Sequence, residues 1–110
     1  MIRLRYGRND DSVIYKLVQE QLVPLSRTVA PHDPSVRKSV QERLRRGRTW
    51  IAATKKRSGA FGFINVWLHN RMLYIDMLAV DPSRRRQGWG SKLLERAERY
   101  ARDAGIRTAY

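Results

Sequence analysis

A short basic segment at residues 84–91 carries the groups in this sequence that are best suited to binding a phosphorylated ligand. It reads Arg-Arg-Arg-Gln-Gly-Trp-Gly-Ser and stands between an apolar run and an amphipathic stretch. In such a loop, backbone N–H groups converge on one anion, and the dipole of the following helix adds positive potential. Gly88 and Gly90 let the backbone approach the anion without an intervening side chain. The segment therefore predicts a pyrophosphate-binding loop.

The glycine spacing distinguishes this loop from two familiar phosphate-binding motifs. The Gly-x-Gly-x-x-Gly pattern of dinucleotide-binding folds is absent, and no Gly-Lys-Ser/Thr follows as in a Walker loop. A strand-to-helix turn with solvated arginines is the alternative interpretation. Strand, turn, loop and helix occur in the order that ligand binding requires, and this order favours the binding interpretation.

Asp76 is the second candidate for chemistry, because it is the only acidic residue in the otherwise apolar run 72–80. A carboxylate buried among apolar side chains is a stronger proton acceptor, so Asp76 is a candidate general base. The alternative is a structural acid that is hydrogen-bonded to the backbone or to an arginine. The neighbouring Tyr74 is expected to pack.

Other residue types that often carry catalysis are scarce. The chain has no cysteine, which excludes disulfides, thiol nucleophiles and thiolate metal sites. Its two histidines, His32 in a proline-flanked loop and His69 in a turn, predict no metal site. Trp89 is expected to pack under the glycine loop or to contact a ligand there. Trp50 and Trp67 are expected in the core or in the lining of a groove.

Alternating and apolar runs predict the strands that position these residues. The expected strands lie at residues 2–6, 49–54, 60–68, 72–80 and 106–110. The fourth of them is nearly all apolar in its later part, so it should be central in the sheet.

Helical spacing of apolar residues predicts three helices between these strands. The first begins at a cap formed by Asp11 or Ser12 and ends at Pro24. The second covers residues 34–46, between a cap at Asp33 and a stop at Gly47. The third opens at residue 91 and ends before Gly105.

Composition limits the class of protein and of partner. The chain of 110 residues is expected to form one domain, and 42% of its residues are hydrophobic. No apolar run is long enough to span a membrane and no signal peptide is visible, so a cytoplasmic location without a membrane partner is expected. The formal net charge is +13, and 14 of the 23 basic residues precede residue 58. Cofactor phosphates cannot account for that excess, so nucleic acid or an acidic protein is a further candidate partner.

The pattern Arg85-x-x-Gly88-x-Gly90 resembles the acetyl-CoA-binding signature of the GNAT superfamily of N-acetyltransferases. The expected order of elements is similar to the first two thirds of a GNAT domain. The resemblance implies an α+β fold, equally described as a three-layer α/β fold, with a mixed, mainly antiparallel central sheet and flanking helices. It covers residues 1–110 with a cofactor motif at 77–104, and the usual C-terminal helix and strands are lacking.

The same resemblance implies where the cofactor, acetyl-CoA as the acyl donor, would bind. Its pantetheine arm would pair with the backbone of the fourth strand, and its pyrophosphate would lie on the glycine loop. The implied cofactor-binding residues are Met77, Leu78, Ala79, Val80, Arg85, Arg86, Gln87, Gly88, Trp89, Gly90 and Ser91. The backbone N–H of Leu78 would donate to the thioester carbonyl. An amine acceptor, a protein or a small molecule, would attack directly in a ternary complex, and no metal takes part.

The later helix of many family members supplies a tyrosine that protonates the thiolate, and no residue here is assigned that role. Two chains are expected to associate as a homodimer, completing each other's sheets. The alternatives to such a homodimer are that the chain is a naturally short form or that it is a fragment.

A catalytically weak GNAT-like module, which binds nucleic acid or an acidic protein through its basic surface, is the competing function.

Overall fold

The computed structural model describes residues 1–25, 33–106 and 108–109, and within them the chain forms one five-stranded sheet. The first four strands are antiparallel to their neighbours, and the last is parallel to the fourth. This arrangement confirms the mixed, mainly antiparallel sheet. In spatial order the strands are β1 (Ile2–Leu4), β2 (Arg48–Ala53), β3 (Ala60–His69), β4 (Met72–Val80) and β5 (Thr108–Ala109).

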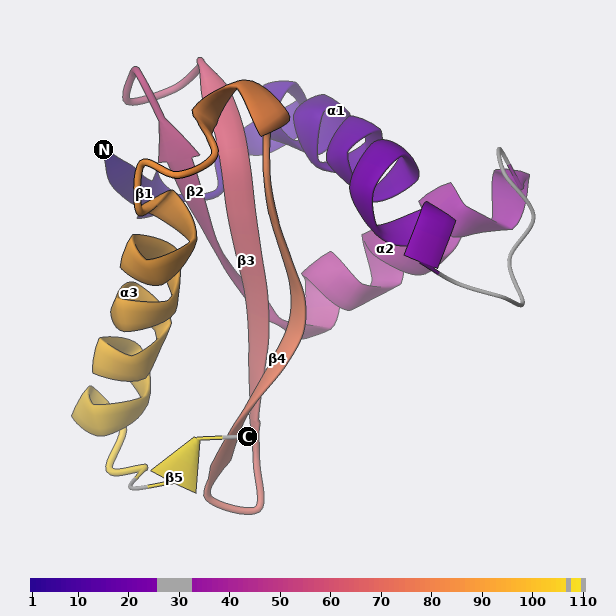
Figure 1. The fold of residues 1–110 in the computed structure, drawn as a ribbon. Coiled ribbons are helices and arrows are strands. Elements are labelled where there is room, and N and C mark those ends of the chain that lie inside the picture. The colour runs from indigo at the N-terminus through magenta and orange to yellow at the C-terminus, as the bar shows by residue number, and fades with distance from the viewer. Residues whose placement is uncertain (26–32, 107, 110) are drawn as a thin grey trace.

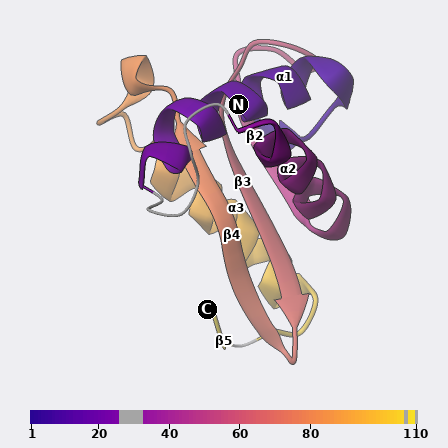
Figure 2. The same cartoon turned by 90° about the vertical axis from the view of Figure 1, so that its right-hand side faces the viewer.

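Helices cover both faces of the sheet and make three layers (Figure 1). α1 (Gly7–Leu17) and α2 (Pro34–Arg46) lie on one face, and α3 (Trp89–Asp103) lies on the other, as the turned view in Figure 2 also shows. Successive strand residues point to opposite faces. Phe63 therefore joins the core under α1 and α2, whereas Ile64 joins the core under α3. No helix in the described ranges is long and apolar enough to cross a membrane.

The strand expected to be central is central over only part of its length. β4 is bordered by β3 along its whole length, but β5 pairs only with Met72 and Leu73. Among the described residues, the outer edge of β4 from Tyr74 to Val80 therefore has no strand partner. β3, which is buried from Phe61 to Val66, is the more enclosed strand.

The second helix agrees with the sequence, and the third ends before Gly105 as predicted but begins at Trp89 rather than at residue 91. Asp33 caps α2 through a hydrogen bond from the Ser35 N–H to its carboxylate (2.9 Å), and Gly47 ends it. That hydrogen bond lowers the pKa of Asp33. Gly105 follows α3 in a left-handed conformation (φ 80°), and the Ile106 N–H donates back to the Ala101 carbonyl at 2.8 Å.

The first helix begins earlier than the predicted caps, Asp11 and Ser12. α1 starts at Gly7, and no side chain caps it. The cause is Asp10, whose buried carboxylate accepts the Tyr6 N–H and forms a two-pronged ion pair with Arg3 at 2.7 and 2.9 Å. A tertiary contact to β1 therefore sets the start of this helix.

The predicted stop at Pro24 also differs from the structure. Regular α-helix ends at Leu17, and a π-helical turn (Val18–Leu22) and a 3-10 turn (Val23–Leu25) follow. The Val23 N–H donates to the Val18 carbonyl, so the chain widens into the π-helical turn before Pro24, which has no N–H to donate.

Candidate functional site

The centre of the site is a β-bulge in β4 at Asp76. Asn65 of β3 pairs with Met77, but the next residue, Val66, pairs with Ile75. Asp76 is therefore an extra residue without a counterpart on β3. Bulges of this kind bend a strand and redirect side chains, and they are common beside functional sites.

Beyond the bulge, the ladder determines which backbone groups of β4 are available. The Asp81 N–H donates to the Phe61 carbonyl at 2.7 Å, at the end of the β3–β4 register. Because backbone groups alternate in direction along an antiparallel strand, Ala79 also bonds toward β3. The N–H and C=O groups of Leu78 and Val80 therefore face the open outer edge. Of the four β4 residues expected to pair with a cofactor, these two expose their backbone groups.

Two clefts run along this open edge. One of about 600 Å³ lies between β4 and α2, is lined mainly by apolar side chains, and includes Asp76, Met77 and Leu78. A smaller cleft of about 260 Å³ continues from Leu78 to Val80 and reaches Arg85. Leu78 lines both clefts, so its outward N–H lies where they meet.

The glycine loop, residues 84–91, lies at the Val80 end of the smaller cleft and lines it through Arg85. Asp81, which precedes the loop, accepts hydrogen bonds from the backbone N–H and the hydroxyl of Ser83 (2.9 and 2.8 Å), which lower the pKa of Asp81. Arg86 and Gly88 have positive φ angles of 65° and 79°. This left-handed pair of residues turns the chain into α3.

The first turn of α3 has free donors. Gly88 is the residue before the helix, and the first intrahelical bond runs from the Lys92 N–H to the Gly88 carbonyl at 3.0 Å. The N–H groups of Trp89, Gly90 and Ser91 precede that bond and have no acceptor inside the helix. No side chain caps this end of α3. The predicted loop residues 85–91 are thus gathered at a helix N-terminus that offers several donors to an anion.

Trp89 packs under the loop, one of the two alternatives that the sequence left open. Its ring meets Phe61 edge-on, with ring centroids 5.1 Å apart. The Arg84 guanidinium lies 4.5 Å from the Phe61 ring and the Lys92 amine 4.2 Å from the Trp89 ring. This stack supports the glycine loop and holds two positive charges beside it.

These features fit an acyl-coenzyme A. A Cβ added at Gly88 or Gly90 would meet no atom within 4 Å, so both positions border open space. Free donors at α3 suit a pyrophosphate, and the outward groups of Leu78 and Val80 suit the amides of a pantetheine arm. Within the described residues, no group of three or more potential metal ligands occurs.

Asp76 is held by hydrogen bonds on both oxygens. Arg43 of α2 donates to Oδ1 at 2.8 Å, and the Asn65 amide donates to Oδ2 at 3.0 Å. Asn65 also donates to the Arg43 carbonyl at 3.1 Å and accepts from the Thr49 hydroxyl at 2.8 Å. The Asp76 side chain is only 5% exposed. Arg43 therefore anchors Asp76, as the structural alternative expected. Asp76 also lines the larger cleft, and its role as a general base stays a prediction.

Sequence reasoning missed the residues that anchor Asp76. Asn65 is a fully buried polar residue in an otherwise apolar strand, which is the available signal. The sequence predicts Gly47 only as a helix stop. A Cβ there would lie 2.5 Å from Asn65 Oδ1 and 2.8 Å from the Val66 carbonyl oxygen, so the glycine is needed for close approach.

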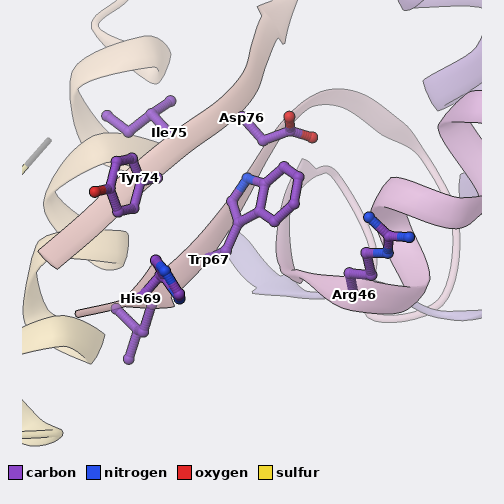
Figure 3. Close-up of a pocket in the computed structure, with 7 residues that line it drawn as sticks. Arg46, Trp67, His69, Tyr74, Ile75 and Asp76 are labelled. Atoms are coloured by element: carbon purple, nitrogen blue, oxygen red, sulfur yellow. The ribbon is translucent and has the colours of Figure 1, made fainter. Parts of the chain in front are cut away.

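A third cleft, which we call the aromatic groove, lies on the other side of Asp76 (Figure 3). It has a volume of about 730 Å³. Its lining comprises Arg46 at the end of α2, Trp67, Leu68 and His69 of β3, and Tyr74, Ile75 and Asp76 of β4. Trp67 thus lines a groove and Trp50 is buried, both as expected.

Tyr74 was expected to pack, but its side chain projects from the sheet at the groove and is 40% exposed. His69 is the exposed last residue of β3 rather than part of the turn, which consists of Asn70 and Arg71. His32 lies outside the described residues.

Comparison with known proteins gives a consistent result. The family model for the acetyltransferase (GNAT) family matches residues 14–110. A search of curated proteins by sequence found no match. A solved structure of a putative GNAT family acetyltransferase from Staphylococcus aureus is similar, with a TM-score of 0.79 and 18% identity over 99% of this chain and 97% of that one.

Two further solved structures are longer than this chain. An aminoglycoside 6'-N-acetyltransferase complexed with coenzyme A matches with a TM-score of 0.74 and 18% identity, over 96% of this chain and 57% of its own. The ribosomal-protein-S18-alanine N-acetyltransferase from Escherichia coli matches with a TM-score of 0.72 and 19% identity, over 99% of this chain and 64% of its own. At these identities the likeness concerns the fold.

The contrast between two glycines gives a stability test. We expect Gly47→Ala to lower the free energy of unfolding by about 1–3 kcal/mol, because the new methyl group collides with Asn65 and the Val66 backbone. Gly90→Ala meets open space in the first turn of α3 and should leave the free energy of unfolding unchanged or raise it slightly, because alanine favours the helix more than glycine does. Urea denaturation of both variants measures the difference. Equal destabilisation by the two substitutions would contradict this account of Gly47.

Proposed function

Because this chain belongs to the acetyltransferase (GNAT) family, we propose that it moves an acetyl group from acetyl-CoA to a primary amine by direct attack in a ternary complex. The observation that carries the proposal is the cleft that runs along β4 from Leu78 to Arg85. Arg85 belongs to the glycine loop, which leads into the free N–H donors of α3. Asp76 lines the adjoining larger cleft at the bulge. Cofactor, thioester and proton acceptor would thus lie in sequence along one strand edge.

The phosphate end is proposed to bind at the glycine loop. The N–H groups of Trp89, Gly90 and Ser91 donate to the pyrophosphate, and Arg85 and Arg86 supply positive charge. Arg85 is oriented by a hydrogen bond to the side chain of Gln21, in the π-helical turn after α1. This hydrogen bond joins the glycine loop to the π-helical turn on the opposite side of the smaller cleft.

The thioester end is proposed to lie at Leu78. Acetyl-CoA supplies an acyl group already activated as a thioester. The Leu78 N–H, which β3 does not use, donates to the carbonyl oxygen and stabilises the negative charge that develops there during attack. Val80, two residues on, presents the same outward groups to the pantetheine arm.

Asp76 is proposed to accept the proton of the attacking amine, directly or through one water. A carboxylate has about four acceptor positions, and Arg43 and Asn65 use two of them. The nitrogen forms a bond to the acyl carbon, the carbon–sulfur bond breaks, and the thiolate leaves. No residue is assigned to protonate the thiolate.

The cofactor site is tested by calorimetric titration with acetyl-CoA. Wild type should bind saturably, and Gly88→Glu should lose binding because the new carboxylate occupies the anion position. Gly105→Glu is the matched control: Gly105 has nearly the same φ (80° against 79°) and equally open surroundings, at the opposite end of α3. It should bind like wild type.

Absence of binding by folded wild-type protein would contradict the proposal. Steeply salt-dependent binding to nucleic acid under those conditions would support instead a module that works through its basic surface.

The role of Asp76 is tested by Asp76→Asn. Acetyl-CoA affinity should persist, while kcat should fall by about 10²–10⁴-fold, because the amide accepts no proton. A kcat within threefold of wild type would make Asp76 an anchor for Arg43 and Asn65 alone.

We further propose that two chains associate through the β1 edge of the sheet. This edge has no strand partner among the described residues, and it exposes Met1, Leu4 and Tyr6 by 48%, 50% and 50%. Pairing of β1 with its copy would cover this edge and these side chains. Light scattering after gel filtration should give twice the mass of one chain, and Leu4→Lys should return the mass to that of one chain. A wild-type monomer would contradict the association.

A further inference from the structure

We propose that the aromatic groove selects acceptors with a flat apolar body that carry a carboxylate as well as the amine, and that it disfavours polycations. This inference rests on the proposed acetyl transfer. It is carried by three observations: the continuity of the groove with the thioester position, its aromatic lining, and the sign of its uncompensated charge.

The groove lies next to the reaction position. It shares Ile75 and Asp76 with the cleft that contains Leu78, so the two clefts meet at the bulge. An amine placed between Asp76 and the Leu78 N–H would extend its remaining atoms into the aromatic groove. That direction leads away from the glycine loop, so the acceptor and the cofactor phosphates occupy opposite ends of β4.

The lining suits a flat apolar body. Trp67 is half-buried, and Tyr74 projects into the groove from β4 (Figure 3). The Tyr74 hydroxyl contacts the Met72 sulfur at 3.7 Å, and its ring lies 6.4 Å from His69 at an angle of 50°. Trp67 and Tyr74 lie directly opposite each other in the β3–β4 register, so both side chains lie on the same face of the sheet. Together they offer aromatic surfaces on which an aromatic or aliphatic group stacks.

Charge in the groove favours an anionic group on the acceptor. Asp76 is the only acidic residue in the lining, and Arg43 already pairs with it at 2.8 Å. Arg46 is exposed, and within the described part of the chain its guanidinium forms no ion pair or hydrogen bond. A carboxylate accepts two parallel hydrogen bonds from a guanidinium, and this geometry makes arginine a selective partner for it.

The same charges disfavour the binding of a polycation. Its second ammonium group would approach Arg46 with no acid in the lining left to receive it, on a chain with a net charge of +13. Like charges in a partly enclosed groove repel one another. The groove therefore discriminates by sign between two acceptors of the same shape.

Three amines of one shape test this inference. They are para-(aminomethyl)benzoate, para-methylbenzylamine and para-xylylenediamine, which carry a carboxylate, a methyl group or a second amine at the same position. Each is titrated calorimetrically into protein saturated with coenzyme A, and each is tested as an acceptor with acetyl-CoA. The benzoate should bind about tenfold or more tightly than the methyl compound, with a matching advantage in kcat/KM, and the diamine should bind least.

Arg46→Glu should invert the order, so that the diamine binds best. Arg45→Glu is the matched control, because it makes the same change of charge on the neighbouring exposed residue of α2, outside the groove lining. It should leave the order of the three amines unchanged, which separates a local contact from a change in overall charge.

The possible results distinguish this inference from the function on which it rests. A preference for the diamine, equal effects of the two glutamate variants, or no binding of any of the three amines would overturn the inference while acetyl-CoA binding stands. Failure of acetyl-CoA to bind would instead overturn the proposed function.

Discussion

The hydrogen-bonded cluster of Thr49, Asn65, Asp76 and Arg43 is the constraint on which the site depends. Asn65 is fully buried, so its amide must be satisfied inside the protein, and it bonds to groups from β2, β4 and α2. The same bonds hold the extra residue of β4 in the bulge. Without these partners, Asp76 would be a nearly buried charge without compensation.

The cluster also determines how closely the helices approach the sheet. The end of α2 lies against Asn65, which only a glycine at position 47 allows. α2 is thereby placed beside the bulge and supplies Arg43 to one cleft and Arg46 to another. One strand therefore carries three environments in order: an aromatic groove, a carboxylate, and an open row of backbone donors that ends at a positively polarised helix.

The sequence predicted those parts that local rules control. Asp33 and Gly47 bound α2, Gly105 follows α3, and the runs around Trp50, Phe63 and Met77 form β2, β3 and β4. The predicted start of α1 was wrong because the observed start depends on an ion pair between Asp10 and Arg3, and Arg3 belongs to β1. The anchors of Asp76 could not be foreseen, because Arg43, Asn65 and Asp76 meet only after the sheet forms. The glycine loop and the start of α3 that follows it were predictable because they depend on one contiguous segment of the sequence.

The direction of the β4 backbone has a consequence for hydrogen exchange. In the part of β4 that has only β3 beside it, the amide of Ala79 is directed to β3 and that of Asp81, which follows β4, is bonded to β3, while those of Leu78 and Val80 face the open edge. Solvent deuterium should therefore enter every second amide quickly and its neighbours slowly. A strand in a completed sheet shows no such alternation, so β4 has the exchange behaviour of an edge on one side and of an interior strand on the other. A molecule that pairs with the free side would remove the alternation.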